Sequence, residues 1–154
     1  MLQDVLAAAE PVGEVIVARG GRSQGAAVQG ALREVDECPV LVINADLPCA
    51  RPRDLFTLLG ALPEGGLALV AAVDGTTNAL ALAAPHLFAP LYGPRSAERF
   101  LARAERLGVR AAVASIPHLA EDVDELDDLE RLEGCLGAHT AAALRVLVSR
   151  AGSA

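Results

Sequence analysis

Short apolar runs alternate along the chain with longer stretches in which apolar residues recur at helical spacing. The apolar runs are rich in Val, Leu and Ala, and they predict strands at residues 15–18, 40–44, 67–73, 79–83 and 109–114. The stretches between them predict helices at residues 2–9, 24–34, 53–61, 97–107, 126–136 and 139–150. Such alternation is typical of parallel strands joined by helical crossovers, with helices on both faces of the sheet. The pattern therefore predicts a layered α/β fold.

The predicted helices have recognisable ends. Ser23 and Ser96 can cap the second and fourth helices, and Gly108 stands where the fourth would stop. No linker, repeat or low-complexity tract interrupts the pattern, and only a short polar tail follows Arg150. We therefore expect one domain over residues 1–154, in which residues 137–154 form a C-terminal helix and tail.

Composition narrows the classes of partner. The net charge is −7, all 13 basic residues are Arg and only 3% of residues are aromatic, which does not fit a nucleic-acid binder. Apolar runs are too short for a membrane span, and Asp4 and Glu10 interrupt the first of them, so no membrane segment or secretory leader is expected. Cys38, Cys49 and Cys135 are odd in number and lack metal spacing. We expect reduced thiols without a role, in a cytoplasmic protein.

An acid stands at the exit of a strand that should be buried. In "LVINADLP" the apolar run ends at Asp46, and Leu47 and Pro48 then turn the chain toward the next helix. Functional crevices of open α/β sheets lie beyond the carboxyl ends of strands, and a carboxylate there can hold Mg²⁺ together with substrate phosphates. The alternative is that Asp46 only orders its own turn.

A second acidic site lies in "EDVDELDDLERL". Asp122 and Asp124 flank one valine after a strand-like stretch, so their side chains are expected on the same side of the backbone. They could complete a metal site with the strand-exit aspartate, or they could be ordinary acids near a helix start. For Glu125, Asp127 and Asp128 the simple interpretation is a solvated helix cap.

Three further motifs could bind anions. In "DGTTNALAL" a polar turn offers Thr77 and Asn78 as donors, although a hairpin explains the turn equally well. In "YGPRSAERF" Gly93 and Ser96 precede a long helix whose free amides could bind a carboxylate or phosphate, unless the serine is only a cap. The Gly-rich run around Gln24 leads into a helix but lacks the spacing of a dinucleotide or P-loop motif. The three histidines are scattered and predict no catalytic triad.

In order, "NADLP", "GTTNALAL", "YGPRSAERF" and "EDVDELDDLERL" resemble the guanylyltransferases of coenzyme F-420 biosynthesis, which act on 2-phospho-L-lactate or phosphoenolpyruvate. The similarity runs from about residue 22 to 136. It implies a glycosyltransferase-A-like fold, with three layers and a mixed, mostly parallel sheet, as in nucleotide-diphospho-sugar transferases. It also implies an enzyme that uses GTP and Mg²⁺ to guanylylate a three-carbon phosphoacid and releases pyrophosphate.

The resemblance assigns roles to individual residues. Asp46 and Asp122 match the catalytic, metal-binding aspartates, with Asp124 as a further metal ligand. The four residues Thr77, Asn78, Gly93 and Ser96 match the phosphoacid-binding motifs. Gln24 lies where the family approaches the nucleotide.

The chain also departs from the family pattern. Family members open with a strand and a basic loop resembling "VKxLxxAKxRL" that embraces the GTP phosphates, whereas Met1 falls within the following helix and residues 1–22 match weakly. Tyr92 and Phe100 replace a family Phe and His. A missing strand would expose an apolar sheet edge, which favours a homo-oligomer. Two alternatives stay open: a nucleotidyltransferase of the same fold with a sugar phosphate or molybdopterin acceptor, and a degenerate module that binds a phosphoacid without turnover.

Overall fold

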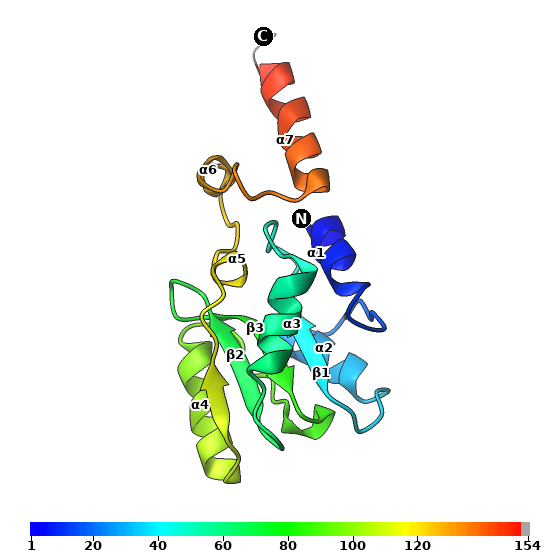
Figure 1. Cartoon of the computed structure of the whole chain (residues 1–154), viewed down its shortest axis with the longest axis vertical. Coiled ribbons are helices and arrows are strands. Elements are labelled where there is room, and N and C mark those ends of the chain that lie inside the picture. Colours follow the sequence, from blue (N-terminus) through cyan, green and yellow to red (C-terminus); the bar gives the residue numbers. More distant parts are fainter. Residues whose placement is uncertain (152–154) are drawn as a thin grey trace.

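The computed structural model describes residues 1–151, and their helices follow the predicted pattern closely (Figure 1). The long helices are α1 (Leu2–Ala9), α2 (Gln24–Leu32), α3 (Pro52–Gly60), α4 (Ser96–Leu107) and α7 (Ala138–Ala151). Shorter ones are η1 (Pro85–Leu87), α5 (Pro117–Ala120) and α6 (Leu126–Arg131). Ser23 caps α2 by accepting a hydrogen bond from the Ala26 amide, and Gly108 ends α4 in the left-handed conformation, as predicted. The polar tail at residues 152–154 lies outside the described residues.

Four strands form one mixed sheet. They are β1 (Val40–Ile43), β2 (Leu67–Ala71), β3 (Thr77–Leu82) and β4 (Ala111–Val113), in the order β1-β3-β2-β4. The central strand β3 pairs antiparallel with both β1 and β2, and only β2 and β4 are parallel. The expectation of a mostly parallel sheet is therefore wrong, because the turn at residues 72–76 joins β2 to β3 as a hairpin rather than a helical crossover.

Helices cover both faces of the sheet, which confirms the three-layer α/β fold. Ala68, Val70, Ala79 and Ala81 point to the face packed by α1, α3 and α5. Four leucines at alternate positions point to the other face, where they pack on α2, η1 and Phe100 of α4: Leu67 and Leu69 of β2, and Leu80 and Leu82 of β3. Since β2 and β3 are buried on both faces, they read as continuous apolar runs.

Some sequence predictions on individual elements are wrong. Residues 15–18 lie outside any strand of the described chain, and Val15, Ile16 and Val17 are exposed. Their β-branched composition cannot form a strand without a neighbour to accept and donate backbone hydrogen bonds. Ser96 is not a cap: Arg95 occupies that position with a φ of 55°, and the Ser96 side chain is fully buried. The helix predicted at 126–136 ends at Arg131.

The C-terminal helix is fastened to the N-terminal one. Asp4 of α1 accepts hydrogen bonds from the amides of His139 and Thr140 at 3.0 and 2.9 Å and from the Thr140 hydroxyl at 2.5 Å. Burial alone would raise the pKa of Asp4, but these hydrogen bonds outweigh it and lower the pKa below the ordinary 3.8. Gly137 sits so close that a side chain there would strike the Asp4 carboxylate. An acid from α1 thus caps α7, whose far end extends away from the sheet (Figure 1).

Candidate functional site

The strand-exit aspartate lies beside the second acidic motif. The Val123 amide donates to the backbone carbonyl of Asp46 at 3.1 Å, which places Asp122 and Asp124 next to the loop that follows β1. Burial is the main cause that raises the pKa of the Asp46 carboxyl; a hydrogen bond from its own amide opposes this increase, and the charges of Asp122 and Asp124 add smaller increases. Two acids far apart in the chain therefore share one electrostatic environment.

Asp46 also has an unsatisfied oxygen. Its Oδ1 is buried and has no hydrogen-bond partner among the described residues. A buried carboxylate oxygen without a donor is costly unless a ligand or cation approaches it. Within residues 1–151, however, no group of three or more His, Cys, Asp or Glu side chains converges as a metal site. A hard cation at Asp46 and Asp122 would therefore need its other ligands from substrate oxygens and water.

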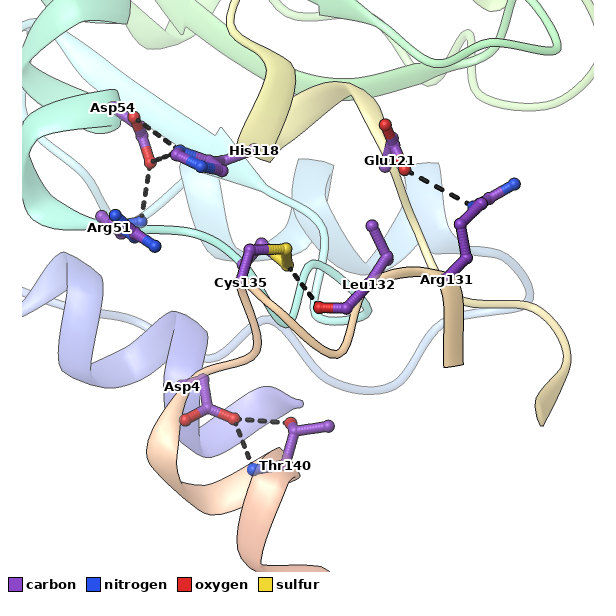
Figure 2. Close-up of a disulfide and its surroundings, with 10 residues drawn as sticks. Asp4, Arg51, Asp54, His118, Glu121, Arg131, Leu132, Cys135 and Thr140 are labelled. Carbon is purple, nitrogen blue, oxygen red and sulfur yellow. Dashed lines mark hydrogen bonds and ion pairs between the residues drawn. A yellow bond between two sulfur atoms is a disulfide. The ribbon is translucent and has the colours of Figure 1, made fainter. Parts of the chain in front are cut away.

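Acidic side chains line a hollow in this neighbourhood. Its walls are Val73, Asp74, Glu121, Asp122, Asp124, Asp128 and Arg131. Glu121 and Asp128 pair with Arg131 at 3.7 and 3.2 Å. Figure 2 shows the Glu121–Arg131 pair. Asp74, which the sequence had not singled out, belongs to the polar turn before β3, so the hollow joins the acidic motif to that turn.

The acids nearest α6 have a structural explanation. The Asp128 side chain accepts from the amides of Asp124 and Glu125 at 3.0 Å, and these bonds, with a smaller contribution from Arg131, lower its pKa. Glu125 and Asp128 form a capping box at the start of α6. The prediction of a helix cap is confirmed for these two residues. Asp124 is exposed, whereas Asp122 is half-buried.

The two predicted phosphoacid motifs meet in the fold. The Ser96 hydroxyl donates to Thr77 Oγ1 at 3.0 Å, and the Ala97 amide donates to the Gly75 carbonyl at 3.3 Å. Thr77 and Ser96 are 1% and 0% exposed, so they hold the turn and α4 together rather than present their hydroxyls at the surface. The expectation of free amides at this helix start is wrong for its first two residues, because the Ser96 amide also donates to Gly93.

The surface beside the Thr77–Ser96 hydrogen bond carries two arginines, and both have partners within the chain. Arg95 forms an ion pair with Glu98, and Arg99 donates to the Tyr92 carbonyl at 2.9 Å. Gly93 has a φ of 109°, which favours glycine and brings the turn close to the Arg99 side chain. The Tyr92 hydroxyl is buried without a partner among the described residues, and burial raises its pKa.

A chain of hydrogen bonds connects the predicted nucleotide motif to the predicted phosphoacid motif. Gln24 Nε2 donates to Asn44 Oδ1 at 2.7 Å, and Asn44 Nδ2 donates to the Thr77 carbonyl at 3.3 Å and to Asn78 Oδ1 at 3.4 Å. The side-chain nitrogen Nδ2 of Asn78 is buried and has no hydrogen-bond partner among the described residues. Sequence analysis missed Asn44, although it stands two residues before Asp46 at the same strand end.

Two of the histidines and two of the cysteines are paired with other side chains. His118 pairs with Asp54 at 3.1 Å and His86 with Glu37 at 2.9 Å, so both imidazoles have a carboxylate partner. Cys49 and Cys135 form a disulfide, so the expectation of reduced thiols is wrong for these two and Cys38 alone is a free cysteine. No helix within residues 1–151 is long and apolar enough to cross a membrane.

A solved structure defines the class of fold. A protein of Desulfovibrio desulfuricans assigned as a nucleotide-diphospho-sugar transferase superposes with a TM-score of 0.55 at 16% identity, over 73% of this chain and 52% of that one. The three-layer fold with its open mixed sheet is therefore of the nucleotide-diphospho-sugar-transferase type.

Sequence comparison defines the family. Residues 1–147 match the family model described as "Guanylyl transferase CofC like", and the chain belongs to this family. Phosphoenolpyruvate guanylyltransferases from Roseiflexus castenholzii and Rubrobacter xylanophilus are 40% identical over 114 residues and 36% identical over 129 residues. These alignments cover 74% and 78% of this chain but 52% and 63% of the relatives. The chain thus spans between half and two thirds of the length of these relatives.

Proposed function

We propose that the protein is a guanylyltransferase that transfers GMP from GTP to a three-carbon phosphoacid and releases pyrophosphate, as a step of coenzyme F-420 biosynthesis. The family membership and the names of the relatives support guanylyl transfer, and those names favour phosphoenolpyruvate over 2-phospho-L-lactate. The observation that carries the proposal is the hydrogen bond between Val123 and Asp46, which brings the acidic motif to the strand-exit acid.

The chemistry needs charge neutralisation rather than a protein nucleophile. A phosphate oxygen of the acceptor attacks the α-phosphorus of GTP, and the bond to the leaving pyrophosphate breaks. The acceptor oxygen is already ionised, so no general base is required. Mg²⁺ held by Asp46 and Asp122 would supply charge neutralisation and alignment for the two polyanions. We propose that Asp124, which is exposed beside these two residues, contacts the cation through a water molecule.

The remaining residues would position the substrates. The Thr77–Ser96 hydrogen bond joins the turn at 75–78 to the start of α4. The neighbouring turn at Gly93 would then present a defined shape to the acceptor. The side-chain nitrogen Nδ2 of Asn78 has no partner among the described residues, so it can donate a hydrogen bond to a ligand oxygen after a small local opening. Gln24, tied to Asn44, would lie on the nucleotide side.

A pyrophosphate-release assay tests the proposal. With GTP, Mg²⁺ and phosphoenolpyruvate or 2-phospho-L-lactate, we expect pyrophosphate release by the wild type and a loss of about 100-fold or more in Asp46→Asn, since removal of one electrostatic stabiliser commonly has this effect. The matched control is Asp127→Asn, an exposed acid of the same motif that should keep full activity. Absence of release with both acceptors contradicts the proposal.

The second candidate is a module that binds the phosphoacid without turnover. It is favoured by the lack of a three-acid metal cluster among residues 1–151. Thermal shifts caused by phosphoenolpyruvate separate the two candidates. A binding module predicts the same shift in the wild type and Asp46→Asn, whereas metal-bridged binding predicts that Asp46→Asn loses the shift and that chelation abolishes it in the wild type. Replacement of phosphoenolpyruvate by a sugar phosphate tests the remaining alternative acceptor.

A further inference from the structure

A covalent bond joins the loop that carries Asp46 to the segment that follows α6. Cys49 lies three residues after Asp46, and it is bonded to Cys135, 86 residues further along the chain, with the two Cα atoms 5.2 Å apart. Cys135 follows α6, whose N-terminal side carries Asp122 and Asp124. Figure 2 shows the disulfide between the loop after β1 and the segment that leads into α7. The bond therefore closes a ring of residues 49–135 that contains Asp122 and Asp124, while Asp46 lies just outside this ring on the Cys49 side.

Few other contacts hold this segment in place. The Val123 amide donates to the Asp46 carbonyl at 3.1 Å, and the Gly137 amide donates to the Pro48 carbonyl at 2.7 Å. Leu129 and Leu132 are the buried apolar side chains of residues 121–137. A segment with few buried apolar contacts opens locally at low cost. The disulfide adds a covalent restraint to these hydrogen bonds and keeps the segment of residues 121–137 close to the loop that carries Asp46.

The two sulfurs differ in access. The Cys49 residue is 1% exposed, whereas the Cys135 residue is half-buried. An incoming thiolate therefore meets the Cys135 sulfur first, and Cys49 becomes the leaving group. The carbonyl oxygen of Leu132 lies 4.0 Å from Cys49 Sγ and can accept the proton of the thiol that results (Figure 2). In the reduced form, the buried Cys49 thiol therefore has a hydrogen-bond acceptor beside it.

We propose that Cys49–Cys135 is a reversible thiol–disulfide modification site that controls the acidic site, with high affinity for a divalent cation in the oxidised form and low affinity in the reduced form. A dithiol is the co-reactant. Its first thiolate attacks Cys135 and forms a mixed disulfide while Cys49 leaves, and its second thiolate then attacks the mixed disulfide and releases Cys135. The dithiol ends as a disulfide, and its two electrons and two protons go to the cysteines. The effect on the cation rests on the proposed function.

The test measures thiols, cation binding and local opening on the same protein. In the oxidised protein we expect one alkylated cysteine per chain, Cys38, and after dithiothreitol we expect three. Reduction should weaken Mn²⁺ binding by about tenfold or more, as loss of groups that orient metal ligands does, and reoxidation should restore it. Amide exchange over residues 121–137 should accelerate on reduction.

Two variants provide controls. Cys135→Ser should bind Mn²⁺ with the weak affinity of the reduced wild type in both conditions, and Cys38→Ser should switch as the wild type does, because Cys38 is free and exposed. Three alkylated cysteines after oxidation, or equal Mn²⁺ affinity in both states, overturns the proposal. If neither state binds Mn²⁺, the proposed metal site is wrong, and unchanged amide exchange would then overturn the modification site separately.

Discussion

At the scale of single residues, the informative feature is a half-buried carboxylate at the end of a strand, where a turn exposed to solvent would be expected. Asp46 ends a strand, is half-buried and keeps one oxygen without a partner among the described residues. Its position after an apolar strand allowed two interpretations, a functional acid or a turn residue. The spacing of Asp122 and Asp124 around one valine made them candidate partners, and the family resemblance then assigned roles to all three. Asn44 could not be predicted, because an Asn after a strand is also an ordinary turn residue, and its bridging contacts depend on the tertiary fold.

The Thr77–Ser96 hydrogen bond gives a prediction at this scale. Both side chains are buried, so Ser96→Ala should lower the free energy of unfolding by about 1–3 kcal/mol because Thr77 Oγ1 loses its donor. Thr77→Val should have a similar effect. Urea denaturation of both single variants and the double variant measures the coupling, which we expect at about 1 kcal/mol. Additive effects of the two substitutions would show that the hydrogen bond contributes nothing of its own.

At the scale of elements, periodicity predicted every long helix, while strand pairing was less predictable. The helices could be predicted from the spacing of their apolar residues and from residues at their ends, such as Ser23 and Gly108. Residues 15–18 have the composition of a strand but not its partner, and the apolar runs of β2 and β3 look the same in parallel and antiparallel sheets. Which strands become neighbours depends on contacts between distant parts of the chain, and no local pattern contains that information.

The Asp4 cap of α7 predicts a pH dependence at this scale. The pKa of Asp4 is lowered in the folded state, so its contribution to stability is present above the ordinary pKa of 3.8 and is lost as the pH falls through the lower folded value. We expect Asp4→Asn to destabilise the fold by about 1–2 kcal/mol at pH 7. The difference from the wild type should shrink below pH 3.8. Urea titrations at several pH values measure it, and a difference that persists unchanged at the lowest pH contradicts the assignment.

At the scale of the whole molecule, two facts shape the account. The sheet and its two helical layers bring four motifs, separated by up to 80 residues or so, to one end of the strands, as open α/β folds do. The chain also spans between half and two thirds of the length of its relatives, and its surface leaves Val146, Leu147 and Val148 of α7 exposed. Association of the chain with itself stays a prediction.

The central claim is that Asp46 and Asp122 hold a divalent cation between them. Titration of Mn²⁺ into the oxidised wild type, Asp46→Asn, Asp122→Asn and the control Asp127→Asn measures this most directly. The account predicts that each of the first two substitutions abolishes binding or weakens it at least tenfold, by analogy with disturbed metal ligands, while the control matches the wild type. Equal affinity in all four proteins would contradict it.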